Sequence, residues 1–533
     1  MKSIRVEKMI DEMTLEEKIG QVVICGFHGT TPNDEINTLI KRYHLGNVIL
    51  FKRNIENPKQ LKELTSSLQD MAKIPLLIAT DQEGGVVTRL TEPFTVFPGN
   101  MATAATGNPK NAYLTGLIMA KEMRAVGINW DLAPVVDVND LPENPGIGVR
   151  SYSDDPGIVA KFALEFVRGL HEGGVTACVK HFPGKGHSAK DAHLEMPVVD
   201  RDRKTLESIE LLPYKRSIEF GIESIMPSHV YYPALCEKRD LPATLSDAVM
   251  GVLLKGEMKF EGVVLTDDLE MRGITNVLSA SDAAHLSFKA GADVLMICHT
   301  FEEQIKVFEK IEEGVRNGEI PMERLNDAVK RVLKLKESIG LLDGKLVIDN
   351  EIGSSESLNI AREIAKRSIT CIRNSDDLLE RIGKSPILLV LPSNATLVKV
   401  EEKIGDGVSE IERAFKEHKD IHVESIYVSA KPSFEERQEV ISKIQGFKGT
   451  ILLGTVNAHI IPEMKTLLDE VVSRRPRDTI VVALRNPYDC FLPGVRNSIA
   501  VYNYTRLSQR IFVEMLLNKE KLVGRLPLIH WRY

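Results

Sequence analysis

The sequence is poor in the features that mark secreted, metal-binding and membrane proteins. Only six of its 533 residues are cysteines, and no two of them form a CxxC pair, so neither a zinc knuckle nor a dithiol redox motif is indicated. The N-terminal segment has no apolar stretch long enough for a secretory signal, and no run approaches the ~18 apolar residues of a membrane span. We therefore expect a cytoplasmic protein with no membrane partner, in a compartment that keeps thiols reduced.

An excess of positive charge is also missing. Lys and Arg number 68 against 75 Asp and Glu, for a net charge of −7, so a general nucleic-acid binder is not expected. Hydrophobic residues make up 43% of the chain and charged residues 27%, as is typical of a soluble globular protein. Length alone suggests three or four domains, but two are equally compatible, because a single barrel can exceed ~250 residues.

Short apolar runs alternate regularly with amphipathic segments over the first 300 residues or so. Thr14 followed by Glu17 forms a capping box, and residues 61–71, 112–126 and 156–172 are long enough for crossover helices. The pattern predicts a (β/α)8 TIM-like barrel, because a doubly wound sheet would need an open edge and usually has fewer strands. Eight continuous apolar runs suit strands buried on both faces: 21–27, 47–51, 75–80, 129–138, 175–179, 223–226, 262–266 and 293–298.

The pattern changes after Gly340. Residues 341–358 are polar and rich in turn formers, which predicts a linker between a barrel domain at 1–340 and a second domain at 359–533. A smaller α/β (αβα) sandwich is expected there, with helices at 434–444 and 460–473. Its strands are expected at 387–391, 421–427, 450–453, 479–484 and 498–502.

Polar and ionisable residues follow several of the predicted barrel strands. Asp81 follows the third run, Lys180 and His181 the fifth, His229 the sixth and Asp267 the seventh. Strand ends are often polar, and a single such residue is more often structural than catalytic. Because barrel enzymes build their sites at the C-terminal ends of strands, the several clusters together indicate a site at one rim.

The segment 180–193 holds the densest set of these groups. In its Gly-rich loop, Asp191 stands two residues before His193 and could fix the tautomer of that imidazole, which would make a general acid/base for neutral pH. A solvated, mobile loop is one alternative. A metal site built from three histidines, His181, His187 and His193, is another, but their spacing does not match a helical zinc site, and we expect no metal.

Asp267 and Asp268 are adjacent, so on a strand they would point to opposite sides. If Asp267 faces the barrel mouth, it suits a nucleophile that attacks a sugar carbon and forms a covalent ester. We expect Asp268 to turn toward the wall or to cap the following helix.

Several motifs give the chain a resemblance to glycoside hydrolase family 3, specifically its β-N-acetylglucosaminidase branch. The Lys-His-Phe-Pro-Gly block that ends in Asp-x-His is specific to this branch. The segment departs from many members at Lys185, where His or Arg is common, and at Ala192, where Ser or Thr is common. The matching segments are DQEGGVVTRL (81–90), GIGVRSYSDDP (146–156), KHFPGKGHSAKDAH (180–193), MPSHVYYP (226–233), LTDDLEM (265–271), RNPYD (485–489) and GRLP (524–527).

The resemblance implies a role for each matching residue. Asp267 would be the nucleophile, His193 the general acid/base and Asp191 the partner of His193, with no metal or organic cofactor. The positions that grip the terminal sugar would be Asp81, Arg89, Arg150, Lys180 and His181.

The implied activity is a retaining exo-β-N-acetylglucosaminidase. Its partner would be a small oligosaccharide from peptidoglycan or chitin, which would place the enzyme in cell wall recycling or chitin degradation. A phosphorylase with the same residues stays open, as does a homodimer. A β-glucosidase or β-xylosidase of the same family would normally take its acid from a Glu elsewhere, and a non-catalytic sugar-binding protein is disfavoured by the intact site residues.

Overall fold

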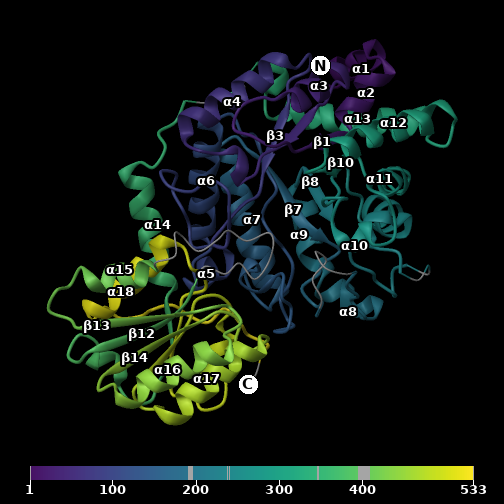
Figure 1. Cartoon of the computed structure of the whole chain (residues 1–533). Coiled ribbons are helices and arrows are strands. Elements are labelled where there is room, and N and C mark those ends of the chain that lie inside the picture. The colour runs from purple at the N-terminus through teal and green to yellow at the C-terminus, as the bar shows by residue number, and fades with distance from the viewer. Residues whose placement is uncertain are drawn as a thin grey trace.

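The first half of the chain forms a closed parallel barrel (Figure 1). The computed structural model describes residues 2–189, 196–236, 238, 240–344, 347, 349–393 and 409–531. Eight parallel strands pair in the order β10-β1-β2-β3-β6-β7-β8-β9, and a bridge between Leu265 and Val294 joins the two ends. The predicted barrel is therefore confirmed. Its strands are β1 (Val23–Cys25), β2 (Asn47–Ile49), β3 (Leu77–Thr80), β6 (Trp130–Asp131), β7 (Thr176–Phe182), β8 (Ser224–Pro227), β9 (Val263–Val264) and β10 (Leu295–Ile297).

Helices cover the outside of the barrel in the crossover positions. The three crossover helices expected from the sequence are present as α4 (Pro58–Met71), α6 (Lys110–Ala125) and α7 (Pro156–Glu172). The short helix α2 (Leu15–Gln21) begins with the predicted capping box of Thr14 and Glu17. The crossover between β8 and β9 is a π-helix instead. The main crossover elements are α3 (Asp34–Arg42), α4 (Pro58–Met71), α6 (Lys110–Ala125), α7 (Pro156–Glu172), α9 (Leu211–Phe220), η4 (Ala248–Glu257), α11 (Ala280–Lys289) and α12 (Phe301–Arg316).

Packed side chains fill the barrel interior and leave the functional groups at one end. Ile24, Trp130 and Met226 are buried in one apolar cluster that includes residues of α13 (Met322–Ser338). Lys336 of α13 donates from Nζ to the carbonyl oxygen of Gly46 at 2.9 Å. Because Gly46 directly precedes β2, α13 closes the N-terminal end of the barrel, and the opposite end remains for a site.

The second half of the chain forms a six-stranded sheet in the order β11-β16-β15-β14-β12-β13. All five predicted strands are present: β12 (Ile387–Pro392), β13 (Val423–Val428), β14 (Thr450–Thr455), β15 (Thr479–Ala483) and β16 (Asn497–Ala500). The sequence did not indicate β11 (Thr370–Asn374). This strand pairs antiparallel with β16 and is only partly buried. An edge strand with polar residues carries no continuous apolar run.

Helices pack on both faces of this second sheet. One apolar cluster joins the sheet to α15 (Glu410–Lys416) and α18 (Arg506–Leu517), and another joins it to α16 (Phe434–Gly446) and α17 (Pro462–Arg474). The αβα arrangement is therefore confirmed, and Figure 1 shows it beside the barrel.

The connection between the two halves is not a bare linker. α14 (Ser355–Ser368) contacts α5 (Asn100–Ala105) and α6 of the barrel as well as α18 of the second half. The predicted domain limits at 340 and 359 stay a prediction. Within the described part of the chain, no helix is long and apolar enough to cross a membrane.

Candidate active site

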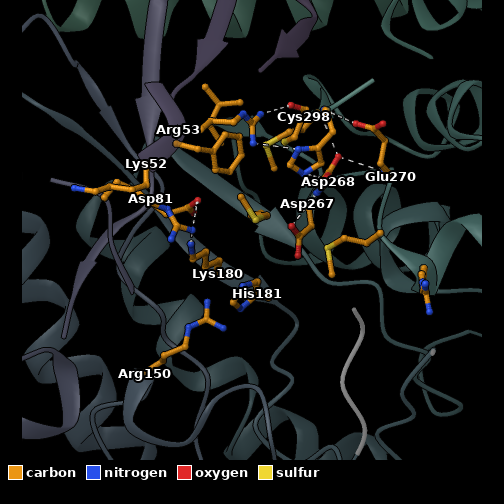
Figure 2. Close-up of a pocket in the computed structure, with 18 of the residues that line it drawn as sticks. Lys52, Arg53, Asp81, Arg150, Lys180, His181, Asp267, Asp268, Glu270 and Cys298 are labelled. Carbon is orange, nitrogen blue, oxygen red and sulfur yellow. Dashed lines mark hydrogen bonds and ion pairs between the residues drawn. The ribbon is translucent and has the colours of Figure 1, made fainter. Parts of the chain in front are cut away.

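A pocket of about 480 Å³ opens at the C-terminal ends of the barrel strands. Figure 2 shows the Asp267 carboxylate across this pocket from Asp81 and Lys180, with Arg150 below them in the view. All the predicted site residues that the structure describes line it together: Asp81, Arg89, Arg150, Lys180, His181 and Asp267. The rim predicted from the strand ends is thus where the structure brings these groups together.

A buried ion network forms one wall of the pocket. Nζ of Lys180 lies 2.8 Å from a carboxylate oxygen of Asp81 and 2.8 Å from one of Glu83. Arg150 binds Glu83 through two donors, Nε and Nη2, each at 2.8 Å. Arg89 approaches Asp81 at 3.5 Å. Glu83 therefore joins two pocket cations that lie 30 residues apart in the sequence.

The network holds Glu83 and Lys180 in their charged forms. Burial acts to raise the pKa of Glu83, but the charges of Arg150 and Lys180 hold it at about 2. Burial acts to lower the pKa of Lys180, yet Asp81 and Glu83 raise it above its usual value. The pocket wall consequently presents fixed charges across the physiological pH range, and such buried charges persist only because each has a partner.

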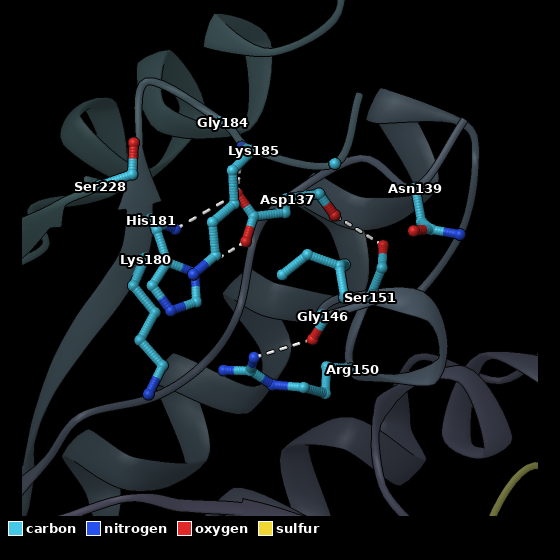
Figure 3. A network of polar contacts seen from close by, with 12 residues as sticks. Asp137, Asn139, Gly146, Arg150, Ser151, Lys180, His181, Gly184, Lys185 and Ser228 are labelled. Atoms are coloured by element: carbon cyan, nitrogen blue, oxygen red, sulfur yellow. Dashed lines mark hydrogen bonds and ion pairs between the residues drawn. The ribbon is translucent and has the colours of Figure 1, made fainter. Parts of the chain in front are cut away.

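His181 is oriented by a carboxylate that the sequence analysis did not identify. Its Nδ1 lies 2.8 Å from Oδ2 of Asp137, which is fully buried beneath the pocket (Figure 3). The other oxygen of Asp137 accepts a hydrogen bond from the backbone N–H of Lys185 at 2.8 Å. Because a carboxylate accepts, Nδ1 of His181 is the donor in this contact, which fixes the orientation of the ring.

Asp267 and Asp268 do not follow the strand geometry expected for them. β9 ends at Val264, so the alternation of a strand no longer applies, and both aspartates line the pocket. The Asp267 carboxylate faces the pocket and Asp268 turns toward the wall at Cys298, as expected, although the residues are not on a strand. Asp268 has a structural use, because its Oδ1 accepts from the N–H groups of Glu270 and Cys298, each at 3.2 Å. It does not cap α10 (Arg272–Thr275), whose N-terminus has no side-chain cap.

The loop that carries Asp267 is held from below by His229. Nε2 of this buried histidine lies 2.9 Å from the carbonyl oxygen of Asp268, and its Nδ1 lies 2.8 Å from Oγ1 of Thr244. Burial lowers the pKa of His229, which favours the neutral ring. Nε2 therefore donates to the carbonyl and fixes the backbone next to Asp267.

The predicted pair Asp191 and His193 lies outside the described residues. The segment before it is anchored, since the Asn144 side chain donates to the carbonyl oxygens of Lys185 at 2.8 Å and Gly186 at 3.1 Å. His187 turns to Asp140 at 2.9 Å. Among the described residues no cluster of three metal-binding side chains occurs. His181 and His187, the two described histidines of the alternative metal site, each have a carboxylate partner, Asp137 and Asp140.

Glu83 and Asp137 are the main site residues that the sequence reasoning missed. Glu83 stands within the quoted DQEGG motif, and Asp137 is one of two acidic residues inside the apolar run 129–138, so the sequence pointed only weakly to each. Another missed residue is Arg53, which lines the pocket and donates to the carbonyl oxygens of Phe27 at 2.9 Å and Cys298 at 2.7 Å.

Comparisons with known proteins agree with this architecture. The model of the glycosyl hydrolase family 3 N-terminal domain matches residues 14–335. Beta-hexosaminidase A of Pseudoalteromonas piscicida is 35% identical over 407 residues, which cover 71% of this chain and 68% of that protein.

Two solved structures extend the comparison to the second sheet. A β-N-acetylglucosaminidase of this family from a Paenibacillus species superimposes with a TM-score of 0.89 at 34% identity and covers 97% of this chain and 99% of its own. A β-glucoside phosphorylase superimposes with a TM-score of 0.83 at 25% identity, over 99% of this chain and 96% of its own. Both halves of the fold therefore have counterparts in solved enzymes.

Substitution of Glu83 by Gln should destabilise the protein in a pH-dependent way. Breaking a buried pair leaves its partners uncompensated, so the free energy of unfolding at pH 7 should fall by about 3–5 kcal/mol. Because the pKa of Glu83 is lowered in the folded state, its contribution is complete above the ordinary carboxyl pKa of 4.5 and is lost as the pH falls toward 2. Urea unfolding across pH 3–7 measures this difference.

The half-exposed Glu207, which pairs with Arg203 on a helix surface, provides the matched control. Glu207→Gln should leave the stability nearly unchanged at every pH. A Glu83→Gln variant as stable as this control would contradict the assigned role of the network.

Proposed function

The chain belongs to glycosyl hydrolase family 3 and is a glycoside hydrolase, and we propose that it releases non-reducing terminal β-linked N-acetylglucosamine with retention. The observation that carries the proposal is Asp267 facing a wall of buried, paired cations across one pocket. A pocket of about 480 Å³ in a filled barrel suits the end of a sugar chain rather than its middle, which supports exo-cleavage.

Asp267 is the proposed nucleophile. Glycoside cleavage passes through an oxocarbenium-like state, which a carboxylate beneath C1 stabilises before it forms the covalent ester. Oδ1 of Asp267 accepts from the backbone N–H of Asp268 at 2.8 Å, and a hydrogen bond to the charged form favours that form. A carboxylate ready to attack at neutral pH is what the first step requires.

His193 is the proposed general acid/base, with Asp191 as its partner. In the first step His193 protonates the leaving oxygen, and in the second it removes a proton from the water that cleaves the ester. His181 also has a carboxylate partner, Asp137, but it lies on the wall with Lys180, among the residues assigned to the sugar. We assign His181 to the grip on the terminal sugar.

The remaining wall residues would bind the sugar hydroxyls and the N-acetyl carbonyl. Lys180, Arg89 and Arg150 supply donors, and Asp81 supplies acceptors. Their mutual ion pairs hold these groups in place before substrate enters, so binding energy can orient the reacting carbon. This arrangement supports recognition of one specific terminal sugar.

Peptidoglycan fragments and chito-oligosaccharides are the proposed substrates. Seven Lys or Arg side chains line the pocket against four Asp or Glu, although the whole chain carries a net charge of −7. This local excess of positive charge favours substrates with an anionic group, as peptidoglycan fragments have. Cell wall recycling in the cytoplasm is the corresponding role, with chitin degradation as the alternative.

A phosphorylase is the second candidate, supported by the same excess of cations and by the likeness to the β-glucoside phosphorylase. A β-glucosidase with a Glu acid has less support. Among the described residues, Glu270 is the glutamate that lines the pocket, and its carboxylate is occupied by the backbone N–H groups of His299 and Thr300 at 2.6 and 3.0 Å.

A panel of nitrophenyl glycosides tests the activity. The wild-type protein should cleave the β-N-acetylglucosaminide with a kcat/KM about 10²-fold or more above that for the glucoside and xyloside, because a site that hydrogen-bonds the acetamido group rejects sugars without it. The product should be free N-acetylglucosamine with or without phosphate. Formation of the sugar 1-phosphate would establish the phosphorylase instead, and a preference for glucoside would overturn the proposed specificity.

His193→Ala should lose activity according to the leaving group. A nitrophenyl group needs little protonation, so cleavage of its first bond should persist, whereas a natural disaccharide should lose about 10²–10⁴-fold. The ester should accumulate, and azide should restore turnover. Burst kinetics on both substrates measure this.

His187→Ala is the matched control, since His187 stands in the same segment but pairs with Asp140 away from the pocket lining. It should behave as wild type on both substrates. Equal losses for His193→Ala on both substrates, without azide rescue, would remove His193 from the acid/base role.

A further inference from the structure

Arg150 enters the pocket from a loop, residues 139–151, that also touches the second half of the chain. The loop follows β6 of the barrel and makes direct hydrogen bonds to residues that follow β15 of the second sheet. The described lining of the pocket comes from the barrel alone. The second half of the chain therefore contributes no residue to the described lining, but it contacts the loop that carries Arg150.

Asn486 and Tyr488, which follow β15, make the contacts nearest to Arg150; His459 and Arg485 also reach this loop, at the carbonyl oxygens of Pro142 and Pro145. Oδ1 of Asn486, a fully buried residue, accepts from the backbone N–H of Val149 at 3.0 Å. The hydroxyl of Tyr488 accepts from Nδ2 of Asn139 at 2.9 Å, and Oδ1 of Asn139 accepts in turn from the N–H of Gly148 at 3.0 Å. Both contacts converge on the two residues that immediately precede Arg150.

The approach of Asn486 is close enough to depend on a glycine. A Cβ atom at Gly148 would lie 2.1 Å from Oδ1 of Asn486, and the φ of Gly148 is +50°. A side chain at this position would therefore meet Asn486 in a conformation that L residues rarely adopt. The loop and the second half of the chain therefore meet here without room for a side chain at position 148.

The same loop reaches the pocket at two places. The Arg150 guanidinium binds Glu83 and donates from Nη1 to the carbonyl oxygen of Gly146 at 3.0 Å (Figure 3). Asn144 holds the carbonyl oxygens of Lys185 and Gly186, at the start of the segment that leads to His193. Because Asn486 and Tyr488 hold the residues directly before Arg150, loss of their contacts would act on the position of this cation.

We propose that Asn486 and Tyr488 are positioning residues of the active site: the second domain sets the place of Arg150 by clamping residues 139–151. The proposal rests on the proposed function for its consequence in catalysis, but not for the clamp itself. A displacement of about 1 Å at a reacting group costs up to about 10²-fold in rate, so a clamp outside the pocket can govern activity.

A double-mutant cycle tests the consequence. Asn486→Ala should lower kcat/KM on nitrophenyl β-N-acetylglucosaminide by about 10- to 100-fold. In an Arg150→Ala background the same change should cost no more than about twofold, because Asn486 acts through Arg150. Tyr488→Phe, which removes only the hydroxyl and keeps the ring, should give a smaller loss with the same dependence on Arg150.

Arg506→Ala is the matched control. Arg506 of α18 reaches Glu92 of the barrel at 3.7 Å, and both side chains are half or more exposed. This contact also links the two halves but does not touch the clamped loop, so its loss should leave kcat/KM unchanged. The proposal would be overturned if Asn486→Ala lowered kcat/KM by the same factor with and without Arg150. Equal losses of kcat/KM in Asn486→Ala and Arg506→Ala would also overturn it.

Hydrogen exchange separates failure of the clamp from failure of the proposed function. Asn486→Ala and Tyr488→Phe should both speed amide exchange in peptides that span 144–151, whereas Arg506→Ala should not. This holds even if the wild-type protein does not cleave the substrate. Unchanged exchange in Tyr488→Phe, with Asn486→Ala folded and equally unchanged, would refute the clamp whatever the activity.

Discussion

The ammonium group of Lys180, held between the carboxylates of Asp81 and Glu83, is the interaction on which the site depends. A charge buried this deeply is tolerated only with partners, and the network that supplies them draws on three segments of the barrel. Asp81 and Glu83 follow β3, Lys180 lies in β7, and Arg150 joins Glu83 from the loop after β6. The network thus fixes three barrel segments relative to one another at the rim.

The same constraint explains which features the sequence made predictable. Strands buried on both faces produce continuous apolar runs, so all eight barrel strands could be located before the structure was known. Asp81, Lys180 and Asp267 follow such runs and could be assigned to one rim. β11 was not predicted, because a partly buried edge strand has no continuous apolar run.

Glu83, Asp137 and the contacts of Asp268 could not be predicted because they depend on distant partners. Glu83 meets Arg150 across 67 positions and Asp137 meets His181 across 44. Local sequence carries no information about such pairings. The turn of Asp268 toward the wall was expected, but its partners were not, because β9 is only two residues long and one of the N–H donors follows the end of β10.

The two halves of the chain contribute differently to the site. The barrel supplies every described residue that lines the pocket, while the second domain supports the loop after β6 from outside. The C-terminal segment continues this support, since the Asp154 carboxylate accepts from the backbone N–H groups of Ile529, His530 and Trp531. A single face of the barrel is therefore stabilised by contacts from residues more than 300 positions away.

The covalent step is the centre of the account, and trapping it is the most direct test. Wild-type protein treated with a fluorinated N-acetylglucosaminyl donor, whose ester hydrolyses slowly, should gain the mass of one sugar. Peptide mapping should place that sugar on Asp267, and Asp268→Asn protein should still be labelled there. A sugar on Asp268, or turnover of the natural linkage with no trapped ester in any variant, would contradict Asp267 as the nucleophile.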